Sequence, residues 1–564
     1  MTPLRLFRLN ASVVGSLAFL AVVVTYGWLA FVVLSPDAVY AGDIGVKYVQ
    51  ARSLADQRFR SLDIPYRGAA VDPERRFVPL RPPFVMPVGR ELQAIFSPAT
   101  AVLDGVFVAL SDYRGMILCA FLSAVLILWL AWRLTDGPEA AVMPIVLGFG
   151  SPLWFYGMIG WEHAPAVALG VLAFFVAARS STLWNAALAG VLLGCGAAIR
   201  DEVILLAPGL AFALWLKHRD LKRAAVAAAG IVAVLAAAGA VEVWWFHRPL
   251  AAHLLHAVHL LRSVFQAAGS PNPDVPALAP LTFHERYAVV IEHWLVGYGG
   301  TVTAAVFSVI VIVSLALRWI CNMRVPMLLA LVALAGLAMS DAWRLVNAPN
   351  WVAGLYRLSP YLVFAALPAA PPGGKVGWMR ATALFCLVSY VGLAFVGADT
   401  PGGKSLGPRL LLPLLPLLAV AAWQSILQHL RAPASVDRWM GRIGLTLAAL
   451  AVAIHLGSTI PAYAGRSAED GAALKSLRTS ATRIVIADDP FTAQLLLPLY
   501  YKKVILLADS QPLASELAAS LGRQRFGNVL LVSRRPPDRR LDLPGYRRTA
   551  STDVGRMTVE EWHR

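Results

Sequence analysis

The chain has 564 residues, of which 58% are hydrophobic and 15% are charged, with a mean hydropathy of +0.63 and a formal net charge of +16. This composition excludes an ordinary soluble protein and favours one large membrane unit. The charge does not indicate nucleic-acid binding, because Lys and Arg gather in short loops between apolar stretches, as the positive-inside rule predicts for cytoplasmic loops.

Apolar stretches of about 17 or more residues recur up to Pro461, and each is long enough to cross a bilayer as a helix. Arg5 and Arg8 precede the first stretch, but no small-residue cleavage site follows it, so we expect a retained anchor. We expect about thirteen spans, at residues 13–34, 116–132, 140–158, 164–178, 183–199, 203–216, 224–246, 301–317, 327–339, 360–370, 381–396, 410–427 and 443–460.

The expected domains are a membrane module at residues 1–461 and a C-terminal domain at 462–564. Starting from a cytoplasmic N-terminus, the spans leave a first outer loop at about 35–113 and a second at about 247–293. The same count predicts that one extracytoplasmic face carries Asp43, Glu162, Arg200, Asp201 and the loops 247–293, 351–357 and 404–409. Ionisable groups that converge at a membrane boundary indicate a site.

After Pro461 the pattern changes. Residues 484–489, 504–509 and 528–533 read as strands, with helices at 491–501 and 511–522 between them, which predicts a small βαβαβ layer outside the membrane. It has no Gly-rich phosphate loop, so we interpret it as a lid or an acceptor-docking domain.

Asp43 opens the first outer loop and is followed by an amphipathic stretch that could lie in the membrane interface as a helix. Two interpretations stay open: a catalytic carboxylate, or an N-cap of that helix. Glu162 and His163 follow an aromatic segment, residues 154–161, whose rings are expected to form an interfacial belt or a sugar platform.

Arg200, Asp201 and Glu202 interrupt an apolar stretch, either as a solvated turn or as a site where a guanidinium meets a phosphate headgroup. Residues 402–405 (GGKS) resemble the end of a phosphate loop, but the first glycine and the preceding strand are missing. What remains is a basic loop from Lys404 to Arg409, suited to a lipid-linked phosphate.

Two further groups carry weaker signals. His253, His256 and His259 could bind a metal or lie on an amphipathic surface helix. The four cysteines have no close-spaced pair, which argues against a zinc site or a disulfide framework.

Together, these features resemble the GT-C superfamily of integral-membrane glycosyltransferases, which includes bacterial lipid A aminoarabinose transferases and protein O-mannosyltransferases. The resemblance rests on the plan of the chain and on local stretches: Gly42-Asp43, Phe96-Ser97-Pro98, residues 154–164, residues 198–202 and residues 403–410 (GKSLGPRL). It implies a helical polytopic membrane fold of about 13 transmembrane helices with a small C-terminal α/β domain.

The resemblance also implies inverting sugar transfer from a polyprenyl-phosphate donor, with Asp43 as general base. Many members carry a second acid beside the first, but here Ile44 follows, so Glu162 is our candidate for a second catalytic acid. We expect Arg200, Arg409 and Lys404 to contact the donor phosphate, and His163 and Asp201 to bind substrate.

The expected partners are a polyprenyl-phosphate sugar, a glycan, lipid or protein acceptor, and membrane lipids, with no nucleic acid. No nucleotide is expected, and the cofactor is left open, including a divalent cation. We expect a multi-pass protein of the bacterial inner membrane with its active site and its C-terminal domain outside the cytoplasm. A flippase of lipid-linked sugars, or a glycan polymerase or ligase, remains an alternative.

Overall fold

The architecture is that of a computed structural model, which describes residues 11–80, 84–88, 91–135, 137–179, 182–248, 289–290, 354–367, 374–397, 406–536 and 540–564. Lys404, the three histidines near position 256, and the expected spans 301–317 and 327–339 lie outside these residues.

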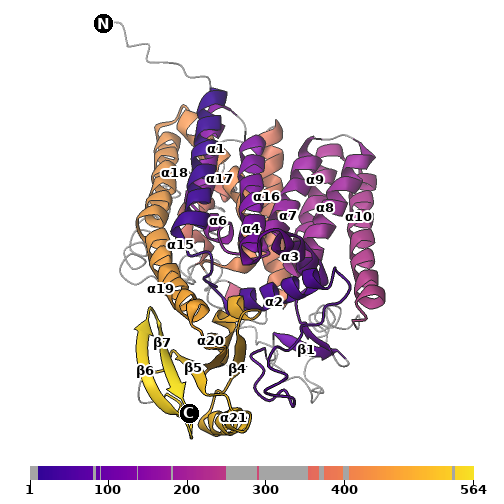
Figure 1. The fold of residues 1–564 in the computed structure, drawn as a ribbon. Helices are drawn as coiled ribbons and strands as arrows, with labels where there is room; N and C mark the ends of the chain where they lie inside the picture. Colours follow the sequence, from indigo (N-terminus) through magenta and orange to yellow (C-terminus); the bar gives the residue numbers. More distant parts are fainter. Residues whose placement is uncertain are drawn as a thin grey trace, which may run out of the picture.

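A bundle of helices forms the larger, upper part of the molecule, and a small sheet domain lies below it (Figure 1). The helical elements of the bundle and its outer loops are α1 (Ala11–Trp28), η1 (Leu29–Val33), α2 (Gly42–Asp56), α3 (Pro98–Ser111), α4 (Tyr113–Leu134), η2 (Pro138–Val142), α5 (Met143–Phe149), α6 (Leu153–Tyr156), α7 (His163–Arg179), α8 (Leu183–Ile199), η3 (Asp201–Leu206), α9 (Ala207–His218), α10 (Leu221–Ala240), η4 (Val241–Trp245), α15 (Leu355–Leu358), η6 (Pro360–Ala366), α16 (Gly374–Gly397), η7 (Arg409–Leu414), α17 (Leu415–Arg431), α18 (Ser435–Ile454), η8 (His455–Thr459) and α19 (Ile460–Thr479).

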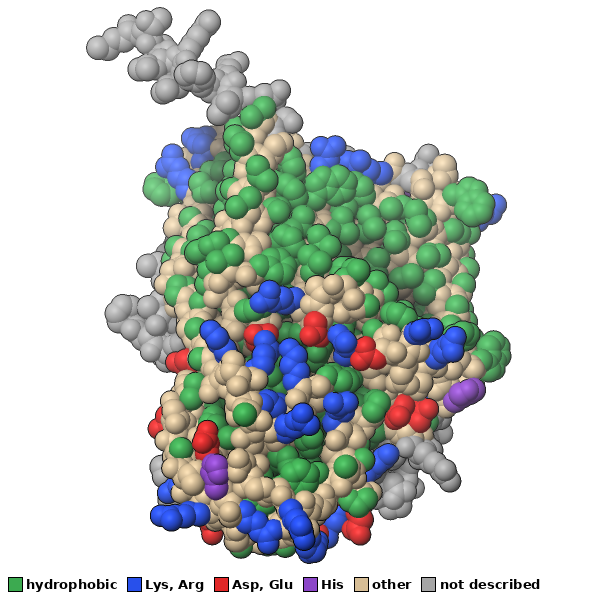
Figure 2. All heavy atoms as spheres, viewed as in Figure 1, with side chains coloured by type: hydrophobic (Ala, Val, Ile, Leu, Met, Phe, Trp, Pro, Cys, Tyr) green, Lys and Arg blue, Asp and Glu red, His purple; other side chains and the backbone are tan. Residues whose placement is uncertain are grey.

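Five helical stretches of the described chain are long and apolar enough to cross a membrane: Val13–Val33, Tyr113–Leu134, Leu221–Trp245, Arg409–Arg431 and Ser435–Thr479. Shorter apolar helices, among them α7 and α8, accompany them. Hydrophobic side chains dominate the upper surface in Figure 2, where the bundle lies. The chain is therefore a multi-pass helical membrane protein with a small C-terminal α/β domain, as predicted.

Three predicted spans differ in the structure. The span at 140–158 is broken into η2, α5 and α6, because Gly150 and Pro152 interrupt the helix. Within residues 360–367, the described part of the span at 360–370, the helical element is the seven-residue 3₁₀ helix η6, which begins with Pro360. The span at 443–460 continues without a break into α19 and ends at Thr479. Hydropathy alone does not reveal where proline or glycine divides an apolar stretch.

α2 lies between the helical bundle and the sheet domain (Figure 1). Eleven of its fifteen residues are buried, including Lys47 and Gln50. Protein covers this helix, because the bundle and the sheet domain both pack against it. Its place relative to a lipid interface stays a prediction. The short antiparallel pair β1 (Val85–Val88) and β2 (Glu91–Ala94) follows in the first loop.

The C-terminal domain contains a five-stranded sheet with strand order β4-β3-β5-β7-β6. As predicted, β3 (Ile484–Ala487) pairs in parallel with β4 (Val504–Leu507) and β5 (Asn528–Ser533). The connections contain α20 (Pro490–Leu495), η9 (Leu497–Leu499) and α21 (Gln511–Arg523). Sequence analysis missed the antiparallel hairpin β6 (Arg547–Val554) and β7 (Met557–His563), which extends the sheet beyond β5.

The sheet domain docks directly on α2. Gly45 of α2 lies against α20 and η9, so that an added Cβ would be only 2.6 Å from the Gln494 carbonyl oxygen and 3.0 Å from Leu497 Cβ. Tyr501 Oη also donates a hydrogen bond to the Val49 carbonyl (2.8 Å). The helix that carries Asp43 is thus held by the membrane module and by the C-terminal domain together. The expected domain boundary at 461/462 falls inside the continuous helical stretch and stays a prediction.

Candidate active site

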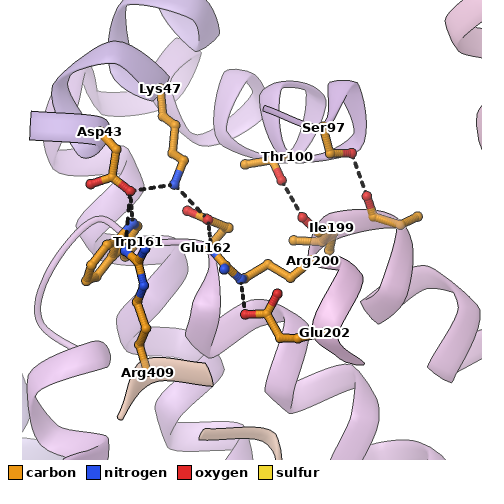
Figure 3. Close-up of polar contacts among 11 residues, drawn as sticks. Asp43, Lys47, Ser97, Thr100, Trp161, Glu162, Ile199, Arg200, Glu202 and Arg409 are labelled. Atoms are coloured by element: carbon orange, nitrogen blue, oxygen red, sulfur yellow. Dashed lines mark hydrogen bonds and ion pairs between the residues drawn. The ribbon is translucent and has the colours of Figure 1, made fainter. Parts of the chain in front are cut away.

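Asp43 lies in the first turn of α2, and its carboxylate points toward the bundle (Figure 3). The N-cap residue of this helix is Ala41, so Asp43 is not the cap. Three groups contact its Oδ2 atom: Trp161 Nε1 at 3.0 Å, Lys47 Nζ at 3.2 Å and Arg409 Nη1 at 3.8 Å. All these contacts go to Oδ2, so within the described part of the chain Oδ1 is left to meet a substrate.

Lys47 is the centre of the site. It follows Asp43 by one helical turn, which places both side chains on the same face of α2. Its Nζ atom donates to Asp43 Oδ2 and also to Glu162 Oε1 at 2.7 Å. The side chain is only 2% exposed, and its ammonium lies 4.2 Å from the centre of the Phe96 ring. A buried ammonium needs such partners, so these contacts hold Lys47 between the two carboxylates.

Glu162 precedes α7 and is 3% exposed. Its Oε1 accepts hydrogen bonds from Lys47 and from Arg200 Nη1. Burial raises the pKa of this carboxyl, but the charges of Lys47 and Arg200 outweigh burial and lower the pKa to about 2. Glu162 is therefore a fully ionised, paired carboxylate at neutral pH.

Arg200 follows the C-terminus of α8 and also donates from Nε to Glu202. Burial lowers the pKa of its guanidinium, but Glu202 and Glu162 raise the pKa overall. The end of α8 is fixed by α3, because Thr100 Oγ1 donates to the Ile199 carbonyl at 2.8 Å and Ser97 Oγ donates to the Ala198 carbonyl. Two carboxylates thus hold Arg200, which orients Glu162 toward Lys47 (Figure 3).

Arg409 approaches Asp43 from the other side of the site. Its guanidinium carbon lies 5.1 Å from the centre of the Trp161 ring, a cation–π distance. With 24% exposure it is more accessible than Lys47 or Arg200, and its Nε atom makes no hydrogen bond within the described chain. Arg409 is therefore the cation of this cluster best placed to receive an anionic ligand.

The remaining candidates are less well connected. His163 is buried between the rings of Tyr156 and Trp161, with ring centroids 5.3 and 4.5 Å away, and neither of its ring nitrogens has a hydrogen-bond partner in the described chain. Asp201 begins η3 and is exposed. The structure thus brings Asp43, Glu162, Arg200 and Arg409 together, with His163 beside them.

The aromatic segment is not an interfacial belt, because Trp154, Phe155 and Tyr156 are fully buried. As for metals, the described residues contain no group of three or more His, Cys, Asp or Glu side chains that could hold an ion.

No protein-family model matches the chain, and neither does any curated protein. Among solved structures, ArnT from Cupriavidus metallidurans bound to undecaprenyl phosphate is similar, with 14% identity, coverage of 97% of each chain and a TM-score of 0.47. The archaeal oligosaccharyltransferase AglB from Archaeoglobus fulgidus, in complex with an inhibitory peptide and a dolichol-phosphate, has 10% identity, 92% and 69% coverage and a TM-score of 0.41.

Sequence reasoning missed two members of the site. Lys47 was visible as the i+4 neighbour of Asp43 in an expected helix, and that spacing predicts a shared face. Trp161 was noted only as one of several aromatics. Its hydrogen bond to Asp43 depends on how α2 meets the segment before α7, a tertiary contact that no local pattern reveals.

Proposed function

We propose that the chain is a glycosyltransferase that moves a sugar from a polyprenyl-phosphate donor to an acceptor hydroxyl, with inversion at the anomeric carbon. The observation that carries the proposal is the carboxylate of Asp43, which is held through Oδ2 by three groups while Oδ1 stays open. The sequence resemblance to GT-C enzymes supports the same role for this residue.

In this reaction Asp43 Oδ1 takes the proton of the acceptor hydroxyl as the acceptor oxygen bonds to the anomeric carbon. The bond between that carbon and the phosphate oxygen breaks in the same displacement, and the electron pair leaves with the polyprenyl phosphate. Attack from the face opposite the leaving group inverts the centre. The contacts on Oδ2 fix the carboxylate so that little reorientation is needed.

The phosphate increases its negative charge as it leaves, and Arg409 is the proposed group that stabilises it. A planar guanidinium binds phosphate through paired N–H groups, and Arg409 is the more exposed cation beside Asp43. Lys404 lies outside the described residues and is proposed as a second phosphate contact. Arg200 is held by Glu162 and Glu202, which supports a structural part in the charge network.

Glu162 is proposed to hold Lys47 in position rather than to accept a proton. Its low pKa and its two cationic partners make it a weak base. Its contact with Lys47 fixes the ammonium that in turn orients Asp43. His163 and Asp201 remain candidates for acceptor contacts. We place the site on the extracytoplasmic face of the bacterial inner membrane, as the loop charges predict.

The test is incubation of the purified protein in vesicles with radiolabelled polyprenyl-phosphate sugars and candidate glycan, lipid and protein acceptors. The proposal predicts a new glycosidic bond and release of polyprenyl phosphate. Label that crosses the vesicle membrane without a new bond would contradict it and would support a flippase. Products of repeated addition to one acceptor would identify a polymerase.

A further inference from the structure

A band of basic side chains follows the seam where the helical bundle meets the C-terminal domain. Figure 2 shows Lys and Arg side chains gathered directly below the apolar upper surface. We use the name basic seam for four exposed residues: Arg67, Arg75, Arg114 and Lys502. None of the four has an ion pair within the described chain, in contrast to Arg52, which is matched by Asp56 and Asp112.

Tyrosine contacts connect the seam across three segments of the chain. The Tyr48 and Tyr501 rings lie 6.4 Å apart, and those of Tyr500 and Tyr501 lie 5.4 Å apart. Arg67 and Arg75 both act electrostatically on Tyr500, and Lys502 follows Tyr501 directly. On the other side, the Tyr48 ring packs on Tyr113, the neighbour of Arg114. The four basic residues are thus each next to, or act on, a member of one group of contacting tyrosines.

The seam lies at the level of a membrane surface. Arg114 is in the first turn of α4, which is one of the candidate spans, so its guanidinium lies where the apolar helix ends. Arg67 and Arg75 belong to the loop between α2 and β1, and Lys502 belongs to the sheet domain. Glu74, beside Arg75, is also exposed, but positive charge remains in excess. Basic side chains next to a bilayer attract anionic lipid headgroups.

We propose that the basic seam binds the phosphate headgroup of an anionic lipid in the adjacent leaflet. This lipid site is independent of the proposed sugar transfer. Binding here would also place a lipid near the helix that carries Asp43, since Tyr48 of α2 contacts both Tyr113, the neighbour of Arg114, and Tyr501, the neighbour of Lys502.

The test measures binding of fluorescent phosphatidylglycerol and phosphatidylcholine to the full-length protein in detergent micelles. The test variant combines Arg67→Gln, Arg114→Gln and Lys502→Gln. The control combines Arg523→Gln, Arg525→Gln and Arg547→Gln, which removes the same charge from exposed positions of the sheet domain. Intact folding is checked by the size-exclusion profile and the melting temperature of both variants.

We expect the wild type and the control to prefer phosphatidylglycerol by tenfold or more, and the seam variant to lose most of that preference. Each basic residue near an anionic surface contributes roughly fivefold, and 0.5 M salt should weaken the preference. A wild type without preference, or a seam variant that keeps it, would overturn the proposal.

Discussion

Lys47 Nζ lies 2.7 Å from Glu162 Oε1, although the two residues are 115 positions apart in the sequence. The same ammonium donates to Asp43 Oδ2, so one buried cation joins the helix after the first span to the segment before α7. This bridge makes the orientation of Asp43 depend on the packing of the bundle, and it defines where a substrate can meet the carboxylate.

Substitution of Lys47 by Met should lower both stability and turnover. Two carboxylates would lose a buried cationic partner, at a cost of about 3 kcal/mol, because an unpaired buried charge is poorly solvated. Turnover should fall more than the Michaelis constant rises, because Asp43 loses orientation rather than substrate contacts. Melting temperature and transfer kinetics are the measurements, and Lys222→Met, at an exposed position on α10, is the control. Unchanged kinetics in Lys47→Met would contradict the bridge.

Substitution of Arg409 by Gln should weaken donor binding. A lost charge-assisted contact to phosphate costs about 1.5–3 kcal/mol, or roughly 10- to 100-fold in the Michaelis constant for the donor. Arg409→Lys should recover part of this loss, since it keeps the charge but not the planar fork. Arg431→Gln, at the other end of the same span, should leave the donor constant unchanged. An equal effect of Arg409→Gln and Arg431→Gln would exclude the phosphate role.

Gly45→Ala should loosen the contact between α2 and the C-terminal domain. The new methyl group would lie 2.6 Å from the backbone oxygen of Gln494, so α20 must shift, at a cost of about 1–3 kcal/mol. Limited proteolysis should then cut the chain faster between α19 and β3. Gly465→Ala on α19 is the control, because an added Cβ there meets nothing within 4 Å. Equal cleavage of both variants would show that the docking is not tight.

Asp488 should make the sheet domain less stable as the pH rises. Asp488 follows β3 and is buried. Burial raises the pKa of its carboxyl, and so does the neighbouring Asp489, whereas Ser533 and Arg535 lower it. The resulting pKa is about 6. Because this folded value exceeds the unfolded one, the native state holds an extra proton, so the stabilisation is full below about pH 4, falls as the pH rises through about 6 and is absent at higher pH.

The Asp488→Asn variant removes this titration. The stability of this variant relative to wild type should therefore increase from pH 5 to pH 8. The measurement at each pH is hydrogen exchange of the β3 and β5 amides. A stability difference that stays constant over this range would show that Asp488 does not titrate there.

Much of the fold could be predicted because local chemistry determines it. The span at 183–199 coincides with α8, and the predicted strand 528–533 coincides with β5, because long apolar runs and short strands bounded by turns have characteristic patterns. The hairpin from Arg547 to His563 was missed because β6 is almost entirely exposed and lacks an apolar alternation.

The site was only partly predictable. Loop parity placed Asp43, Glu162, Arg200 and Arg409 on one face, and their contacts show that these four side chains meet. Parity could not reveal that Lys47 and Trp161 contact Asp43, or that Glu202 competes for Arg200, since these depend on side-chain packing.

The most direct test of the account is the transfer rate of Asp43→Asn. Asn keeps the size of the side chain and can still accept a hydrogen bond, but it cannot take the proton of the acceptor hydroxyl. The matched control is Asp56→Asn, at an exposed position of the same helix. Both proteins should fold and bind donor alike, as shown by melting temperature and donor affinity. We predict that Asp43→Asn lowers the single-turnover rate by about 10²–10⁴-fold and that Asp56→Asn leaves it unchanged. An undiminished rate in Asp43→Asn would contradict the assignment of Asp43 as the base.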